Sequence, residues 1–385
     1  MGMSWKQIIA ESKASRRELH VIPETCWQEF KTFKYLTERL NGLEIRWRRC
    51  AKTGIVAQLA QDAPGEHLAL RADMDGLFLE EANTFAHRST EQGCMHGCGH
   101  DGHMAVALAI AHWLKVNEKA LPGPVSLIFQ PAEEGGFGAK AMIEDGALEG
   151  IDKIFGWHNW PAIPYGKVVC KPGVVMAANA SFTIVVKGSG GHASQPEICR
   201  DPVLAAAAIT LGLQQIVSRR TSPQQAVVVS VTSIDARSGL TVIPDKAVLQ
   251  GSVRAGSTEG LHKIGALIEQ AACSIAKGYD VEADVHFSLR YPSVINTPDE
   301  TDHFDKALAA VFGADYQCLT TAVPLMASED FSYYLEKIPG AFVLVGAGDG
   351  GRYSIPCHNS TYDFNDQLIE PVVSALSLLV GAPLP

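Results

Sequence analysis

The chain has 385 residues, 46% of them hydrophobic, and a formal net charge of -10. This length exceeds what one hydrophobic core usually serves, so we expect two domains of an ordinary globular protein. The negative charge, without any run of basic residues, argues against nucleic acid as a partner and favours a small-molecule substrate. Its nine cysteines lack the spacing of a disulfide framework, and neither a signal peptide nor an apolar segment of roughly 18 residues is visible. We therefore predict a cytoplasmic protein without membrane contact.

Helices and apolar runs alternate through the first half of the chain. Helices are predicted over residues 4–20 and 28–40, since Ser4 can cap the first and Gly42 can end the second. A third helical pattern covers about 103–116. The apolar runs between these helices occupy residues 54–59, 67–71, 125–129 and 153–156. The alternation predicts an α/β fold with a largely parallel sheet.

Polar residues follow three of these apolar runs. Asp73 and Asp75 come after the second, Glu133 and Glu134 after the third, and His158 after the fourth. In open α/β sheets, ligands bind beyond the carboxyl ends of the strands. We therefore expect these side chains to meet at one edge of the sheet.

The second half of the chain contains a unit with a different pattern. Strands and helices are predicted in the order β-α-β-β-α-β over residues 180–187, 201–216, 226–232, 247–254, 259–277 and 281–288. This order is typical of a two-layer, ferredoxin-like α+β domain inserted into the chain. A strand over 342–345 and a last helix over 365–380 follow. We predict a discontinuous domain of residues 1–179 and 291–385, and an inserted domain of residues 180–290.

The segment from His96 to His103 concentrates potential metal ligands. Cys98 and His100 would supply thiolate and imidazole, which suit zinc and its first-row neighbours, and the glycine between them lets both side chains turn to one point. Asp101 and the other histidines of the segment are expected to support the site or start the helix. The alternative is a glycine-rich loop that only caps this helix.

The other polar residues have both functional and ordinary interpretations. Side chains of Glu133 and Glu134 diverge in extended backbone, so one can bind metal while the other acts as general base, although such a pair alone is usually solvated. His158 could equally be a core histidine and His358 an exposed loop residue. His192 follows a glycine turn in the inserted domain, either as an exposed hairpin residue or as an electrophile reaching over a cleft.

Taken in order, these motifs resemble the M20 metallopeptidase family. They match in particular its branch of amidohydrolases and aminoacylases, which includes hippurate hydrolases and hydrolases of auxin–amino acid conjugates. The resemblance extends from about residue 14 to 375. It is carried by residues 96–103, 131–135, 156–158, 190–194, 328–331 and 358–360.

The resemblance implies a catalytic centre with two divalent metal ions per subunit, which could be Zn, Mn, Co or Ni. By similarity its ligands would be Cys98, His100, Glu134, His158 and His358, with the Cys98 thiolate able to bridge. Glu133 would be the general base. His192 would stabilise the oxyanion in the partner subunit's active site, so the inserted domain would be a lid and dimerisation domain. The wider superfamily usually has His-x-Asp where this chain has Asp73-Met74-Asp75, and Asp75 is expected to orient a ligand.

These residues predict an enzyme that hydrolyses the amide bond of N-acetyl or aroyl amino acids, giving a carboxylic acid and a free amino acid. Arg254 is the candidate partner of the substrate carboxylate, or else a surface arginine, and Asn179 is a second candidate. Thr241 stands where the branch commonly has asparagine, which affects substrate contacts nearby. The alternatives are a dinuclear dipeptidase or carboxypeptidase, and a non-catalytic metal- or peptide-binding relative. We expect a homodimer or higher homo-oligomer.

Overall fold

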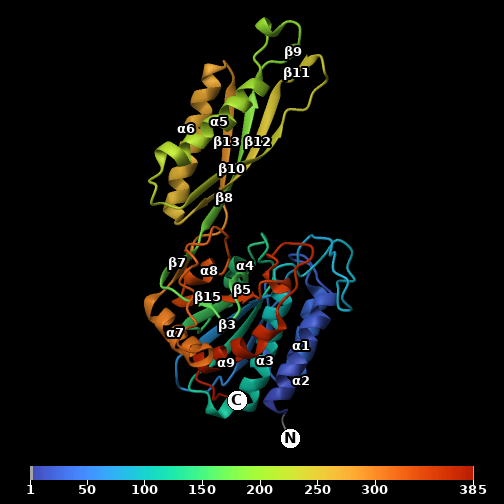
Figure 1. Cartoon of the computed structure of the whole chain (residues 1–385), viewed down its shortest axis with the longest axis vertical. Coiled ribbons are helices and arrows are strands. Elements are labelled where there is room, and N and C mark those ends of the chain that lie inside the picture. Colours follow the sequence, from blue (N-terminus) through green and yellow to red (C-terminus); the bar gives the residue numbers. More distant parts are fainter. Residues whose placement is uncertain (1–2, 385) are drawn as a thin grey trace. The chain divides into compact units, whose positions relative to one another are not determined.

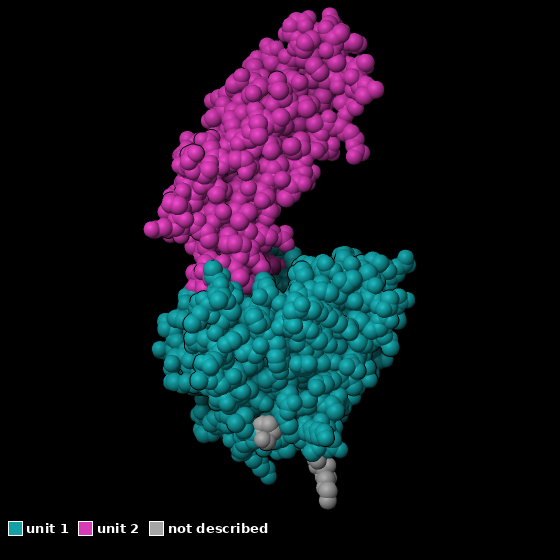
Figure 2. All heavy atoms as spheres, viewed as in Figure 1, with its two compact units in different colours: residues 1–173, 295–322, 330–385 teal, residues 174–294, 323–329 magenta. Residues whose placement is uncertain are grey.

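The computed structural model describes residues 3–384, and these form two compact units (Figure 2). Unit 1 comprises residues up to 173, residues 295–322 and residues from 330 onward; unit 2 comprises residues 174–294 and 323–329. The predicted boundaries, after residues 179 and 290, differ from these by a few residues. Segment 323–329 falls in unit 2 rather than with the rest of the C-terminal part, because Leu325 exchanges backbone hydrogen bonds with Val175 and Ala177 at 2.9 and 2.8 Å.

Unit 1 is built on a mixed sheet with the strand order β1-β2-β4-β3-β5-β15-β6. The central strands β4, β3, β5 and β15 run parallel, and β1, β2 and β6 pair antiparallel at the two sides. Their bounds are β1 (Arg46–Cys50), β2 (Gly54–Leu59), β3 (Leu68–Asp73), β4 (Val125–Gln130), β5 (Lys153–Pro164), β6 (Val168–Val169) and β15 (Gly340–Gly348). The predicted α/β fold with a parallel centre is therefore confirmed.

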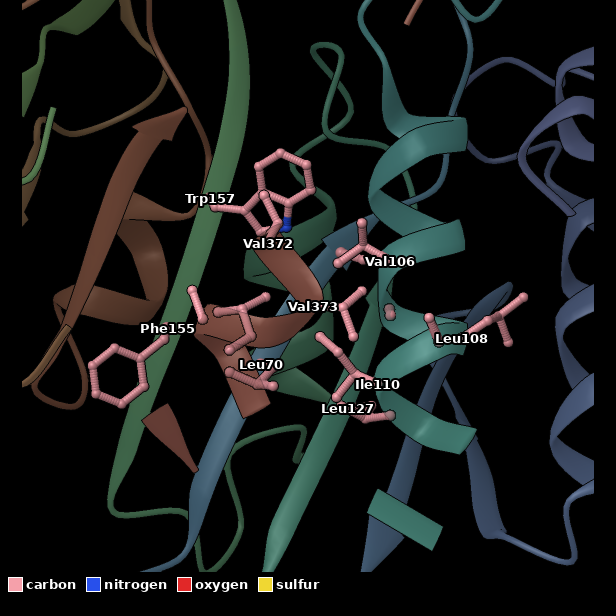
Figure 3. Close-up of a cluster of buried hydrophobic side chains, with 14 of the residues drawn as sticks. Leu70, Val106, Leu108, Ile110, Leu127, Phe155, Trp157, Val372 and Val373 are labelled. Carbon is pink, nitrogen blue, oxygen red and sulfur yellow. The ribbon is translucent and has the colours of Figure 1, made fainter. Parts of the chain in front are cut away.

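Helices cover this sheet. They are α1 (Trp5–Val21), α2 (Phe30–Gly42), α3 (His100–Val116), α4 (Gly138–Glu144), α7 (Pro298–Phe312), α8 (Ser332–Leu335) and α9 (Ile369–Leu379). Side chains of α3 and α9, such as Ile110 and Val373, pack against Leu70, Leu127 and Phe155 of the sheet (Figure 3). Full burial of such a side chain contributes roughly 1.5–3 kcal/mol. Strands β3 and β4 are buried at every position, as expected for parallel strands covered on both faces.

Unit 2 has the predicted β-α-β-β-α-β order. It consists of β8 (Ala178–Lys187), α5 (Pro202–Arg220), β10 (Val227–Asp235), β12 (Lys246–Ala255), α6 (Thr258–Gly278) and β13 (Glu282–Leu289). The antiparallel sheet runs β10-β12-β8-β13, and α5 and α6 pack on one of its faces (Figure 1). A separate short pair joins β9 (Gly191–His192) to β11 (Val242–Ile243). The chain passes between the units near β7 (Gly173–Met176) and β14 (Val294–Asn296).

One prediction about a strand end is wrong. His158 lies inside β5 rather than after it, because the strand continues to Pro164 alongside β15. Two predicted helix starts also move: α3 begins three residues earlier, at His100, and α9 begins only at Ile369, after a 3-10 turn over Asp366–Leu368. None of the helices among residues 3–384 combines the length and apolarity needed to cross a bilayer.

Candidate metal centre

The metal loop, residues 95–99, enters α3 through a turn that only glycine can make. Gly99 has φ +98°, and a Cβ at this position would lie 2.3 Å from Asn159 Oδ1. Without a side chain the backbone can turn there at no steric cost. Cys98 and His100 consequently flank the turn, with His100 as the first residue of the helix.

The structure brings all five predicted metal ligands together. Ligand atoms of Cys98, His100 and Glu134 lie within 4.8 Å of one another. His158 Nε2 lies 3.4 Å from Cys98 Sγ, and His358 Nε2 lies 3.1 Å from Glu134 Oε1. A backbone hydrogen bond holds the loop with His358 in this place: the His358 N–H donates to the Gly97 carbonyl at 2.8 Å. The cluster thus joins the start of α3, the middle of β5 and three loops.

The hydrogen bonds of two histidines leave one ring nitrogen of each for a metal. His158 Nδ1 lies 2.7 Å from the Asn159 carbonyl, and His100 Nδ1 lies 2.8 Å from the Asp75 carbonyl. A carbonyl only accepts, so Nδ1 carries the hydrogen and Nε2 keeps its lone pair in the neutral ring. Burial and neighbouring histidines hold the pKa of His158 well below its usual value. This ring is therefore neutral, as a metal ligand must be.

The residues fit a divalent cation. His100 Nε2 is buried without a hydrogen-bond partner, which costs free energy that a cation would recover. Burial alone would lower the pKa of His100, but the charges of Asp73 and Asp75 raise it to about 10. The same negative charge attracts a metal ion. Thiolate, imidazole and carboxylate donors together suit zinc and its first-row neighbours.

The thiol of Cys98 depends on such a cation for its ionisation. Contact with Cys357, followed by burial, raises the pKa of Cys98 well above its usual value. A bound metal deprotonates a coordinating thiol outright. In contrast, burial raises the pKa of Glu134, but the hydrogen bond from His358 and the charge of His100 lower it further, to below its usual value. This candidate ligand is therefore ionised at neutral pH.

Asp75 supports both glutamates of the next loop. Its carboxylate accepts hydrogen bonds from the backbone N–H of Glu133 at 3.1 Å and of Glu134 at 2.9 Å. Glu133 is 7% exposed, and its Oε1 accepts a hydrogen bond from the Asp330 backbone N–H at 3.4 Å. The candidate base therefore lies beside the ligand cluster with its loop fixed at the backbone.

A buried polar network lies behind the ligands. His103 Nδ1 lies 2.6 Å from Asp73, and His103 Nε2 lies 2.8 Å from Asn159 Oδ1. His103, Asp73, His100 and His158 also form a group of potential ligand atoms within 4.8 Å. Because both ring nitrogens of His103 are already hydrogen-bonded, we assign His103 to support rather than to metal binding.

Sequence reasoning missed the cation that completes this network. Arg71 donates to Asp73 at 2.6 Å, to Asp330 at 3.0 Å and to Gln130 at 2.9 Å. These bonds fix the ends of β3 and β4 relative to the segment before α8. The available signal was a charged residue inside an apolar strand, because arginine is rarely buried without partners.

His192 lies in unit 2, on β9, with an exposed side chain. The backbone N–H of Ser194 donates to His192 Nδ1 at 3.2 Å, and the Ser194 hydroxyl lies 2.7 Å from the same atom. Since Nδ1 accepts, Nε2 carries the hydrogen of the neutral ring and can donate outward. Strand β9 pairs with the distant β11 rather than forming the predicted hairpin, and it presents the His192 hydrogen-bond donor at an exposed position.

The two candidate substrate residues are neighbours in the sheet of unit 2. Arg254 and Asn179 lie opposite each other on β12 and β8. Arg254 donates to Ser252 Oγ at 2.7 Å, and burial together with Arg290 lowers its pKa. Two nearby guanidinium groups make this end of the sheet attractive to an anion. Asn179 Oδ1 accepts a hydrogen bond from the Tyr291 N–H at 2.7 Å, so this oxygen stabilises the local backbone.

Residues 69–382 match the model of peptidase family M20/M25/M40. The chain belongs to this family. Among its relatives, the hippurate hydrolase of Campylobacter jejuni is 36% identical over 94% of each chain. The N-acetylcysteine deacetylase of Bacillus subtilis is 39% identical over 89% of each chain. A solved structure of a dinuclear metal-binding M20 peptidase from Bacillus subtilis is 32% identical, with a TM-score of 0.84, and covers 97% of this chain and 98% of its own.

These comparisons confirm the predicted family and the predicted class of enzyme. This M20 protein is an amidohydrolase, with hydrolase relatives across most of its length. The donor cluster and the dinuclear relative together support the use of divalent metal ions.

Proposed function

We propose that this M20 protein hydrolyses the amide bond of N-acyl amino acids and releases a carboxylic acid and a free amino acid. The observation that carries the proposal is the convergence of the ligand cluster with a separate, backbone-anchored carboxylate, Glu133. Two relatives are named for hippurate and N-acetylcysteine, and both of these compounds are N-acyl amino acids. We therefore place N-acetyl and N-aroyl amino acids first among the candidate substrates.

The five ligands would hold two divalent ions per subunit. Cys98 Sγ lies 3.4 Å from His158 Nε2 and within 4.8 Å of ligand atoms of His100 and Glu134, so its thiolate would be available to both ions. A set of thiolate, imidazole and carboxylate donors can bind Zn, Mn, Co or Ni. When bound, such ions lower the pKa of water and polarise a carbonyl group.

The protein's own groups would move the protons. Glu133 would accept a proton from the attacking water and pass it to the leaving nitrogen of the amide. His192 would donate from Nε2 to the carbonyl oxygen as negative charge develops there, since Ser194 occupies Nδ1. Arg254 would bind the α-carboxylate of the substrate through its guanidinium group, with Asn179 beside it.

We also propose a cytoplasmic homodimer formed through unit 2, in which unit 2 acts as a lid and His192 serves the partner's active site. The exposed position of His192 on β9 supports a role outside its own fold. The cysteines of the described chain are all free, which suits a reducing compartment.

The main alternative is a dinuclear dipeptidase or carboxypeptidase, because the Bacillus subtilis structural relative is a peptidase. A non-catalytic metal- or peptide-binding role is disfavoured because binding does not require Glu133. Steady-state assays with N-acetyl amino acids, hippurate-like aroyl amino acids and dipeptides test the proposal. We expect the highest kcat/KM for an N-acyl amino acid. A dipeptide turned over far better than every N-acyl amino acid would overturn the substrate assignment.

A further inference from the structure

The loop with the candidate base, residues 131–138, contains backbone that would not be stable alone. Ala132 and Phe137 have φ +55° and +60°, a region that residues with a side chain rarely occupy. The loop closes on itself, since the Gly138 N–H donates to the Ala132 carbonyl at 3.0 Å. Strained backbone of this kind persists only where the surroundings over-determine it.

The segment between α1 and α2 provides two of the groups that hold this loop. The Glu29 side chain is fully buried, and its Oε1 accepts a hydrogen bond from the Ala132 N–H at 2.9 Å. At the far end of the loop, the Trp27 indole N–H donates to the Gly136 carbonyl at 3.0 Å. Glu133 lies between these two anchors. Its own N–H is held by the Asp75 carboxylate at 3.1 Å.

Glu29 is itself fixed by donors on two sides. The Trp27 backbone N–H donates to Oε1 at 2.9 Å, and the Thr53 hydroxyl donates to Oε2 at 2.7 Å. Burial, and next the charge of Asp75, raise the pKa of Glu29 to about 7. A glutamine side chain has the same shape and can present its amide oxygen to the same two N–H groups, those of Ala132 and Trp27. What the loop requires from Glu29 is an acceptor oxygen at a fixed place.

We propose that Glu29 and Trp27 are positioning residues for the general base, and that they act by anchoring both ends of the loop around Glu133. This inference rests on the proposed function, in which Glu133 moves the proton. A displacement of about 1 Å at a catalytic group can cost about a hundredfold in rate. Anchoring of the loop from the N-terminal segment would therefore act on kcat.

The test compares kcat, KM and metal content of the metal-loaded enzyme with its best N-acyl amino acid. Glu29→Ala is expected to lower kcat about 10- to 100-fold, with KM within about threefold of the wild-type value. Glu29→Gln keeps the acceptor oxygen and is expected to restore kcat to within about threefold. The matched control is Glu24→Ala in the same segment: Glu24 accepts from the N–H groups of Lys31 and Thr32, so this variant should lower Tm and leave kcat unchanged.

A double-mutant cycle separates positioning from general destabilisation. In a Glu133→Gln background, Glu29→Ala should cause no further loss of kcat, because the positioned group is already gone. An equal loss in both backgrounds, or a wild-type kcat in Glu29→Ala, would overturn the inference. If Glu133→Gln itself remained fully active, the proposed function would fail instead. Should Glu29→Ala not fold, Trp27→Phe decides the matter: it removes the indole N–H together with part of the ring and keeps the backbone N–H that donates to Glu29. An unchanged kcat in this variant would contradict the proposed anchoring of the loop.

Discussion

The loop with Glu133 and the short β9–β11 pair with His192 hold their candidate functional side chains in opposite ways. The loop is buried or half-buried in unit 1. Neighbouring carboxylates accept hydrogen bonds from its backbone N–H groups. The residues of the short β9–β11 pair are exposed or half-buried, and His192 contacts Ser194, two residues further along the chain. Under the proposed mechanism, the fold of unit 1 preorganises the proton-transfer group Glu133, whereas His192 would act as a donor from an exposed strand.

The largest expected effect comes from replacing the candidate general base, Glu133. Glu133→Gln should lower kcat by about 10²- to 10⁴-fold, because general base catalysis typically contributes this much. Metal content should stay unchanged, since the ligand cluster is intact. Elemental analysis and steady-state kinetics on the same preparation measure both quantities. Wild-type activity in the variant would rule out the proposed mechanism.

The second-largest expected effect comes from replacing His192 on β9. His192→Ala should lower kcat by about 10²- to 10³-fold, the typical cost of one oxyanion donor, with Tm close to wild type because the side chain is exposed. If His192 serves the partner's site, mixing inactive His192→Ala and Glu133→Gln subunits should restore activity. A mixed dimer then has one site with both groups intact. Absence of recovery, with subunit exchange demonstrated, would argue that His192 acts within its own subunit.

The ligand cluster can be weakened one donor at a time. Cys98→Ser should lower metal affinity by more than about a hundredfold, because a hydroxyl ionises far less readily than a thiol, and even supporting residues cost 10–100-fold. Competition with a chelator and elemental analysis measure the affinity. Cys273→Ser in α6 of unit 2 is the matched control and should keep full metal content. Unchanged affinity in Cys98→Ser would remove this residue from the ligand set.

A smaller effect concerns pH and the ionic groups that support unit 1. Burial alone would lower the pKa of His20, but Asp101 at 2.7 Å and Glu81 at 3.2 Å raise it to about 9 from 6.5. The protonated His20 ring stabilises the folded state. This contribution to the free energy of unfolding is fully present below pH 6.5 and is lost as pH rises through 9. Between pH 7 and 10 the wild type should therefore lose at least about 1 kcal/mol more unfolding free energy than His20→Gln. Denaturant titrations with parallel pH dependence for both proteins would contradict this assignment.

Much of the fold could be predicted because the buried strands are apolar along most of their length. The runs at 54–59 and 125–129 correspond to β2 and β4 almost residue for residue. Strand β1 was missed, since Arg-Trp-Arg-Arg-Cys shows no apolar alternation at this exposed edge. The length of β5 was underestimated because its continuation past His158 depends on pairing with β15, which no local pattern reports.

The grouping of the candidate metal ligands could also be predicted from the sequence. The residues that support this group, such as Glu29 and Arg71, could not. Cys98, His100 and Glu134 have side chains whose chemistry is visible in the sequence. The roles of Glu29 and Arg71 depend on contacts with Ala132 and Asp330, far away in the chain. A glutamate near a helix start and an arginine in a strand have many ordinary explanations. Only the folded arrangement distinguishes among these explanations.

The most direct test of the proposed function is a metal titration of the chelator-treated protein. Zn²⁺, Mn²⁺, Co²⁺ or Ni²⁺ is added in steps while release of the free amino acid from an N-acyl amino acid is recorded. We predict that activity appears with metal and reaches its plateau at two ions per subunit. A plateau at one ion, or no turnover of any N-acyl amino acid at full occupancy, would contradict the proposed dinuclear amidohydrolase.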